Sequence, residues 1–427
     1  MIKRYTEEPS EILANRWPNI SIESNELARY TSRILEDIKS RGLDAVLEYT
    51  EKFDEINLEP ENIQVNEEEI KRAYEKTTDE QVMAIKESQK RLEKVESLRL
   101  EQQNFNMNLK GVEIRCSTRP LSVVGCYVPG GKALYPSTLV MNVTPAKVAG
   151  VDEVIVCTPP GKDRKVAPII LVAADICEVD KIYKLGGIQA IASMAYGIKP
   201  IKKVDKIVGP GNRYVTEAKR QVSDIVAIDK PAGPSEILII ADETADPVLV
   251  SKDLISQAEH GQGGLSGLVT VSESLANQVA KEIERNLENV YNKSTVKSVL
   301  DEGGFIYTVD NLDTAIKFAN EFAPEHLEII IKKPENILDK IRNAGLVLLG
   351  SYTPVSSTDY CMGVNHILPT EGYAKISSGL SVLDFVKPIS IIRAEEQGLR
   401  EIEGHIRALA EAEGLRNHYL ALEARLK

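Results

Sequence analysis

The sequence predicts an α/β protein of two incomplete doubly wound, Rossmann-like parallel-sheet domains, with small helical segments at the N- and C-termini. Short β-branched runs alternate with helix-like segments after residue 119, and a second series of this kind extends from 236 to about 380. Such alternation is typical of parallel strands joined by crossover helices. The strand-like runs are almost wholly apolar, which suits a sheet buried on both faces.

The first hundred residues differ from the rest in texture. Residues 1–21 are a polar arm that includes Trp17 and lacks the apolar stretch of a secretory signal. From 22 to about 103 the chain is highly charged, and apolar residues recur at three- and four-residue spacing, which indicates helices. Gly42 is expected to end the first helix in a left-handed conformation.

The first α/β series carries glycine and proline where strands end. Its successive segments are LSVVGCYV, STLVMNVTPAKVAG, EVIVCT, APIILVAADICE, KIYKLGG, IQAIASMAYG, KIVGPGN, RYVTEAKRQV and IVAID. The turn residues gather at 129–131, 186–187, 209–211 and 233–234. Open α/β sheets bind ligands at such strand ends, so these turns are candidate binding segments.

The second series supplies the strand candidates EILIIA, GLVTVS, FIYTV and LVLLG. From Val386 the pattern predicts helix to the end of the chain. This final stretch is too short to hold a core of its own, so it is expected to dock on something larger, a partner subunit being one candidate.

Composition excludes several functional classes. A formal charge of -12 and a pI near 5.2 oppose a general role on nucleic acid or on an anionic membrane. The five cysteines are widely spaced without a CxxC pair, which favours free thiols in a reducing cytoplasm. No apolar run approaches the roughly 20 residues that cross a bilayer.

Histidine is scarce, with five in the chain, so each is a candidate ligand or base, although a packed or surface position is the commoner role. In DLISQAEHG, Gln257 and His260 are three residues apart, hence on one face of a predicted helix that Gly261 ends. Nitrogen and oxygen ligands of this kind suit zinc.

Three further groups are candidates on weaker grounds. Asp359 lies in a polar loop after LVLLG and could be a ligand or a turn cap. Glu413 and His418 are five residues apart on the predicted last helix, where surface exposure is the competing interpretation. The pair Glu325 and His326 follows Pro324, which predicts a helical turn presenting a carboxylate beside an imidazole that could act as a base.

Known phosphate motifs are missing. The turn GCYVPGGKALYPST resembles a Walker loop, but Ala133 stands after Lys132 where a hydroxyl residue is required. No GxGxxG follows the first strand, so a dinucleotide would have to bind in an unusual way.

Taken together, the segments resemble the histidinol dehydrogenase family across nearly the whole chain. The most specific are GCYVPGGKALYPSTLVMNVTPAKVAGV, KLGGIQAIASMAYG, KIVGPGNRYV, DKPAGPSEILIIAD, DLISQAEHG, APEHLEI, SSTDYCMGVNHILPT and AEAEGLRNH. The resemblance implies a cytoplasmic homodimer that oxidises L-histidinol to L-histidine through L-histidinaldehyde, in the final steps of histidine biosynthesis. It also implies NAD as oxidant and one zinc ion per subunit.

The same resemblance assigns the site residues and the domains. It implies that the zinc ligands are Gln257, His260, Asp359 and His418 and that the catalytic residues are Glu325 and His326. The implied substrate contacts are Ser235, His366 and Glu413, together with the zinc ligands and His326. The implied NAD contacts are Tyr127, Gln189 and Asn212. The expected domains are an arm (1–21), a main domain with the metal and catalytic residues (22–126 with 235–380), an inserted NAD-binding domain (127–234), and a C-terminal helical segment (381–427) that forms the dimer and contributes to the site.

Other chemistries stay open at this point. A thiol could trap the aldehyde, with Cys116 and Cys126 as candidates, but neither has a neighbouring histidine to lower its pKa, so a hydrated aldehyde is favoured. The same metal shell could serve a zinc hydrolase acting on a small substrate with an amino group. A non-catalytic binding protein on this fold is a third possibility.

Overall fold

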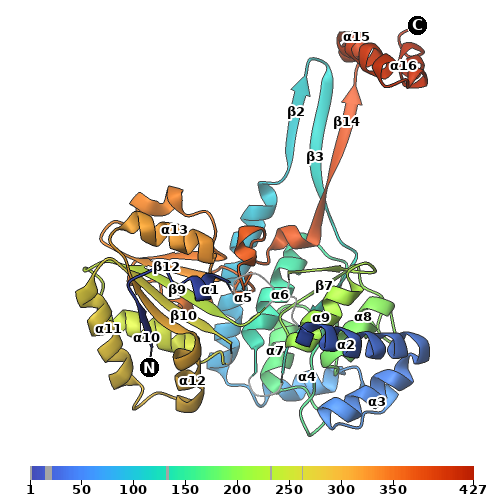
Figure 1. The fold of residues 1–427 in the computed structure, drawn as a ribbon. Helices are drawn as coiled ribbons and strands as arrows, with labels where there is room; N and C mark the ends of the chain where they lie inside the picture. The colour runs from blue at the N-terminus through green and yellow to red at the C-terminus, as the bar shows by residue number, and fades with distance from the viewer. Residues whose placement is uncertain (1, 15–21, 131–133, 231–232, 262) are drawn as a thin grey trace.

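The computed structural model describes residues 2–14, 22–130, 134–230, 233–261 and 263–427. Within them, two lobes lie side by side and a long stalk projects from the body, as Figure 1 shows. Trp17 and the loop residues Gly131, Lys132 and Ala133 lie outside the described residues. No described helix is both long enough and apolar enough to span a membrane.

The first lobe is built on a five-stranded parallel sheet with the order β6-β5-β4-β7-β8. Its strands are β4 (Val123–Tyr127), β5 (Glu153–Cys157), β6 (Lys181–Tyr183), β7 (Lys206–Val208) and β8 (Ala227–Ile228). The connections are α6 (Pro136–Ala149), α7 (Pro168–Ile176), α8 (Gly187–Tyr196) and α9 (Arg213–Val222). The order reverses between β4 and β7, which is the switch point of a doubly wound sheet.

The second lobe repeats this topology. Its parallel sheet has the order β1-β11-β10-β9-β12-β13, so five strands follow the order of the first lobe and β1 is added at one edge. The strands are β1 (Lys3–Tyr5), β9 (Glu236–Ala241), β10 (Leu265–Thr270), β11 (Gly304–Thr308), β12 (His326–Ile330) and β13 (Leu346–Leu349). The helices are α10 (Pro247–Ala258), α11 (Glu273–Asn286), α12 (Lys293–Gly303) and α13 (Leu312–Phe322), and a 3-10 turn covers Pro334–Lys340. The predicted pair of doubly wound sheets is therefore confirmed.

The N-terminal helices pack on the first lobe, with α2 and α3 against α8, α4 against α7, and α5 against α6. They are α2 (Ile22–Arg41), α3 (Leu43–Asp54), α4 (Glu67–Tyr74) and α5 (Asp79–Glu101), with a 3-10 turn at Pro60–Asn62. The short helix α1 (Ser10–Ala14) instead packs through Ile12 and Leu13 on the core of the second lobe. The predicted domain that joins 22–126 to 235–380 stays a prediction. Gly42 has a φ of 65° between α2 and α3, as expected.

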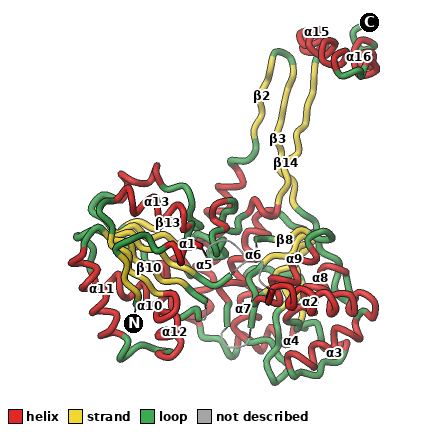
Figure 2. Tube along the Cα trace, viewed as in Figure 1, coloured by secondary structure: helices red, strands yellow, loops and turns green. Residues whose placement is uncertain are grey.

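The stalk is an antiparallel sheet that the sequence pattern did not predict. It consists of β2 (Phe105–Leu109), β3 (Val112–Pro120) and β14 (Val386–Ala394), in the order β14-β3-β2. Figure 2 shows the three strands running out together to α15 (Glu396–Ala412) and α16 (Arg416–Glu423). The helix expected from Val386 is wrong for its first nine residues, because VKPISIIRA is rich in β-branched residues and pairs with β3.

The stalk exposes apolar side chains. The most exposed are Phe105, Met107, Leu109, Ile389, Ile391 and Ile392, each at least 42% exposed. The register places Phe105, Met107, Leu109 and Ile392 on one face of the stalk and Ile389 and Ile391 on the other. Exposed apolar side chains gathered in this way are unusual on a monomer.

Candidate active site

The predicted catalytic pair lies at the amino end of β12 in the second lobe. His326 is the first residue of β12 and Glu325 directly precedes it, so the expected helical turn is wrong. Ser235 directly precedes the neighbouring strand β9. Gly233 and Pro234 also precede β9, whereas the three other predicted turn segments follow β4, β6 and β7. The second lobe thus gathers these residues at the edge opposite to the usual ligand edge.

His326 is held as a neutral imidazole with one open acceptor. Its Nδ1 lies 3.0 Å from the backbone carbonyl oxygen of Glu236, an acceptor, so Nδ1 carries the proton. Its Nε2 is buried and makes no hydrogen bond within the described residues. Burial lowers the pKa of His326 to about 3, which keeps the ring uncharged near neutral pH.

Glu325 is fixed against the same strand by a reciprocal pair of hydrogen bonds. The backbone N–H of Glu236 donates to Oε2 of Glu325 at 2.8 Å, and the backbone N–H of Glu325 donates to Oε2 of Glu236 at 3.4 Å. Oε2 of Glu325 lies 3.6 Å from Nδ1 of His326. The carboxylate and the imidazole are therefore oriented by one residue of the adjacent strand.

Gln257 and His260 lie beside this pair, but not on one helix. Helix α10 ends at Ala258, and His260 belongs to the turn that follows, where its N–H donates to the carbonyl of Gln257 at 3.2 Å. Gly261, with a φ of 101°, continues the turn. Gln257 is buried, and its Nε2 makes no hydrogen bond within the described residues. The residue His260 as a whole is exposed to solvent, but the protein around its imidazole desolvates the ring and lowers its pKa.

Asp359 and His366 complete the cluster. His366 Nδ1 lies 2.8 Å from the backbone carbonyl of Asp359, and its Nε2 lies 3.3 Å from Oγ1 of Thr138 on α6. Burial raises the pKa of the Asp359 carboxyl to about 6 and lowers the pKa of His366 to about 4. The charge of His260 also lowers the pKa of both His326 and His366, so the three imidazoles are near neighbours.

The remaining predicted residues of this site are far away in the same chain. Glu413 ends α15 and His418 lies on α16, with Gly414 between the helices, so the two are not on one helix. Both are exposed at the tip of the stalk (Figure 1). Across the described residues, no group of three or more His, Cys, Asp or Glu is arranged to hold a metal. Within one chain, Gln257, His260 and Asp359 could supply three ligands, of which Gln257 would bind through its amide oxygen; the unpartnered Nε2 is the other polar atom of the same buried amide.

The predicted cofactor residues lie at the carboxyl edge of the first lobe. Tyr127 ends β4, and its hydroxyl accepts the Gly187 N–H at 3.2 Å. Gln189 on α8 donates through Nε2 to Asp54 at 3.0 Å, while its buried Oε1 makes no hydrogen bond in the described part of the chain. Asn212 caps α9 by accepting two backbone N–H groups at 3.0 and 3.1 Å.

A buried ion pair that the sequence analysis missed supports this edge. Lys219 and Asp229 form a salt bridge and clamp Gly209 from both sides: Gly209 N–H donates to Asp229 at 2.7 Å, and Lys219 Nζ donates to the Gly209 carbonyl at 2.9 Å. Gly209 has a φ of 114°, and a Cβ there would overlap the carbonyl oxygen of Tyr127. Only the GPGN motif gave a signal for this loop.

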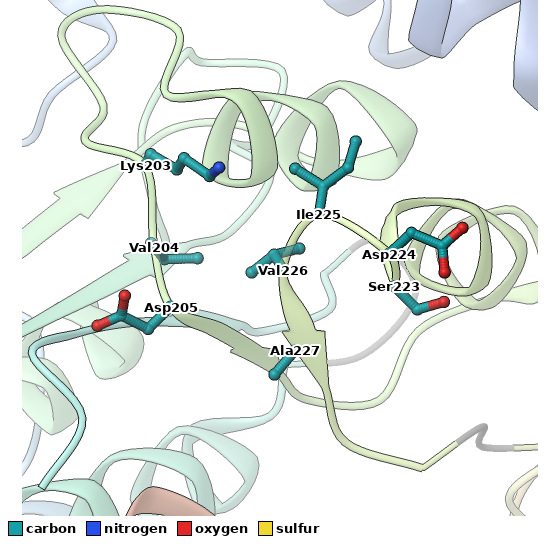
Figure 3. Close-up of a pocket in the computed structure, with 8 residues that line it drawn as sticks. All are labelled: Lys203, Val204, Asp205, Ser223, Asp224, Ile225, Val226 and Ala227. Atoms are coloured by element: carbon teal, nitrogen blue, oxygen red, sulfur yellow. The ribbon is translucent and has the colours of Figure 1, made fainter. Parts of the chain in front are cut away.

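Hollows in the surface lie on both edges of the first lobe. At the carboxyl edge, a cavity of about 320 Å³ is lined by residues that include Pro129, Gly130, Thr158, Pro159, Arg72 and Lys76. At the opposite edge, a depression of about 530 Å³ lies beside β7 and β8 (Figure 3). It contains none of the predicted site residues, and its Asp205 carboxylate already accepts the N–H groups of Ser122 and Val123 at 2.9 Å each.

The five cysteines are free thiols, as expected. Cys126 is buried in β4, where burial raises its pKa, and Cys116 lies on the stalk strand β3. A raised pKa disfavours the thiolate needed for a covalent adduct. The preference for a hydrated aldehyde therefore gains support from the position of both residues.

Behind the site, the buried carboxyl group of Glu328 and the half-buried carboxyl group of Asp253 share a hydrogen bond. Glu328 lies two residues after His326 on β12, and Asp253 lies one helical turn before Gln257 on α10. Glu328 also accepts the N–H of Val355, on the short helix that leads to Asp359, at 2.9 Å. A bond between two carboxyl groups requires a proton. Burial and the nearby charge of Asp253 raise the pKa of Glu328, and burial raises the pKa of Asp253 to about 6.

Two doubly wound lobes, with a neutral buried imidazole beside a carboxylate, define an α/β protein of the kind that can carry proton-transfer chemistry. The histidinol dehydrogenase family model matches residues 19–426. The chain therefore belongs to the histidinol dehydrogenase family, and it catalyses the oxidation of histidinol in histidine biosynthesis.

Individual relatives agree over nearly full length. The chain is 46% identical to histidinol dehydrogenase of Methanosarcina barkeri, over 94% of this chain and 92% of that protein. It is 45% identical to the Clostridium acetobutylicum enzyme, over 95% and 94% of the two chains. The crystal structure of histidinol dehydrogenase from Elizabethkingia anophelis matches with a TM-score of 0.94 and 38% identity, covering 100% of this chain and 98% of that chain.

The carboxyl pair gives a test of stability against pH. Both folded-state pKa values are raised, so the folded protein binds the proton more tightly than the unfolded chain, and stability falls as pH rises from about 4. In Glu328→Gln an uncharged amide replaces the protonated acid, so the loss between pH 4 and 7 should shrink by about 1–3 kcal/mol. Thermal melting midpoints measured across this range check it, with the exposed Glu321→Gln as the matched control. Parallel pH curves for wild type and Glu328→Gln would contradict the shared proton.

Proposed function

We propose that this chain forms a zinc-dependent, NAD-linked homodimer that converts L-histidinol to L-histidine through L-histidinaldehyde. The observation that carries the proposal is the buried His326 Nε2, an open proton acceptor beside Gln257, His260 and Asp359. The overall reaction removes four electrons: histidinol, one water and two NAD⁺ yield histidine, two NADH and the released protons.

The residues have separate roles in this proposal. NAD supplies the hydride acceptor, and zinc supplies a Lewis-acidic anchor for the substrate nitrogens. His326 Nε2 accepts the hydroxyl proton of histidinol, and the Glu236 carbonyl keeps its ring in the required tautomer. Glu325 activates the water that adds to the aldehyde. Ser235 and His366 form part of the wall against which the substrate lies.

The NAD position is inferred from the carboxyl edge of the first lobe. Tyr127, Gln189 and Asn212 lie on three different elements there, and the unpartnered Oε1 of Gln189 is available to a donor on a ligand. The 320 Å³ cavity beside β4 and β5 has Arg72 and Lys76 in its lining, a suitable charge for phosphate. The clamped Gly209 loop allows close approach of backbone to a ligand.

The homodimer is inferred from what one chain lacks. Three of the four proposed zinc ligands lie in the two lobes. The fourth, His418, lies at the tip of a stalk that exposes apolar side chains. A second copy covering those side chains would bring Glu413 and His418 of the partner subunit to the site. Isologous pairing of two stalks is the simplest closed arrangement.

The hydrolase alternative is not favoured, because the family is one of dehydrogenases. The net charge of -12 supports a protein without nucleic-acid or membrane partners. A cytoplasmic location is consistent with a biosynthetic role and with the free cysteines.

Turnover tests the proposed reaction directly. Purified protein given L-histidinol and excess NAD should form two NADH for each histidinol consumed, followed by absorbance. His326→Ala should lower kcat by a factor of about 10² to 10⁴, the usual contribution of a general base. His326→Asn keeps a donor for the Glu236 carbonyl without a basic nitrogen, so it should fold normally and be equally inactive. Consumption of histidinol without NADH would refute the proposal.

Metal removal tests the zinc assignment. Dialysis against a chelator should abolish NADH formation, and stoichiometric zinc should restore it. Direct metal analysis should find one zinc per chain in the wild type and much less in His260→Ala. Full retention of zinc by His260→Ala, with an intact fold, would contradict the proposed ligand set.

Subunit mixing tests the shared site. His326→Ala and His418→Ala should each be inactive as homodimers, because each lacks one necessary group in every site. After co-expression, half of the dimers are mixed and each holds one complete site, so activity should recover to about a quarter of wild type. No recovery, with mixed dimers shown to be present by differential tags, would place each site within one chain.

A further inference from the structure

Two neighbouring imidazoles in the site have the same tautomer but different surroundings at Nε2. His326 and His366 each place Nδ1 against a backbone carbonyl, at 3.0 and 2.8 Å respectively. A carbonyl only accepts, so Nδ1 carries the proton in both rings, and in neutral imidazole Nε2 must then be the acceptor. Nε2 of His326 is open, whereas Nε2 of His366 lies 3.3 Å from the hydroxyl of Thr138.

The direction of the Thr138 contact follows from this tautomer. An acceptor nitrogen needs a donor, so the Thr138 hydroxyl donates its proton to His366 Nε2. Both ring nitrogens of His366 are then engaged. Thr138 is itself buried, with 4% of its surface exposed, so water competes little for its proton.

Thr138 belongs to the other lobe. It lies in the first turn of α6, the helix that follows β4, while His366 follows Asp359 in the segment attached to the second lobe. A second bond, from Asn365 Nδ2 to the Met141 carbonyl at 2.7 Å, fastens the same helix to the residue beside His366. The imidazole of His366 is thus oriented from one lobe by α6 and from the other by Asp359.

We propose that Thr138 is a positioning residue for histidinol oxidation, which holds His366 as a fixed wall of the substrate pocket and leaves His326 as the imidazole with an open acceptor. His366 then acts on the substrate through the orientation of its ring and not by accepting a proton from it. The inference rests on the proposed function, because it takes histidinol to bind against this cluster.

A pair of substitutions isolates the hydroxyl. Thr138→Val keeps the shape of the side chain and removes the donor, whereas Thr138→Ser keeps the donor and removes a methyl group. Loss of one hydrogen bond should raise KM for histidinol about three- to tenfold. KM for NAD and kcat should change less than about twofold, and Thr138→Ser should stay close to wild type.

Two kinetic outcomes would overturn the inference. One is an unchanged KM for histidinol in Thr138→Val; the other is an equal loss in both variants, which would indicate packing and not the hydroxyl. Failure of the proposed function is distinguishable, because the wild type itself would then form no NADH from histidinol.

A spectroscopic measurement tests the tautomer without activity or a stable Thr138 variant. With five histidines in the chain, ring nitrogens of wild-type protein labelled with ¹⁵N-histidine can be resolved by NMR and assigned with His366→Gln. We expect His366 to be protonated at Nδ1, with an Nε2 signal displaced toward the hydrogen-bonded range relative to that of His326. Protonation of His366 at Nε2 would reverse the bond with Thr138 and overturn the proposal.

Discussion

The arrangement of the site depends on one constraint, the pairing of β9 with β12 at the amino end of the second sheet. In this register His326 lies beside Ile237, so the carbonyl of Glu236 meets the imidazole and its side chain meets the backbone of Glu325. A slip by one residue would turn His326 to the opposite face of the sheet. The almost wholly buried strands make such a slip costly, so the apolar core fixes the register that holds His326 in its tautomer.

The two lobes repeat one topology but use opposite edges of their sheets. In the first lobe, glycine-containing turns leave the carboxyl edge open, and Lys219 with Asp229 holds one of them rigid. In the second lobe, α10 runs back across the sheet and delivers Gln257 and His260 to the amino edge. Helix α6 joins these two edges, since it starts after β4 and reaches His366. A cofactor in one lobe and a substrate in the other would therefore meet near α6.

The sequence pattern predicted the elements whose structure depends on residues close together in the chain. Buried strands and amphipathic helices have short periods, so both sheets could be predicted, and the resemblance named residues such as His260 and Asp359. The stalk could not be predicted from periodicity, because β14 pairs with β3 across more than 260 residues and its exposed apolar residues resemble a helix pattern. The Asp253 and Glu328 pair and the Thr138 contact were missed because an isolated acid or threonine carries no signal of its long-range partner.

The stalk also bears on the proposal that one chain supplies only part of the metal shell. A three-stranded sheet with side chains such as Ile392, 66% exposed, on its surface gains little from folding alone, because its apolar area stays in water. In the proposed dimer, a second subunit that covers this surface would stabilise the stalk. The same contact would place α15 and α16 against the lobes of the partner subunit. Folding of the stalk and completion of the proposed metal shell would then be one event. Selection against solvent-exposed apolar surface would in this way maintain the geometry needed for the reaction.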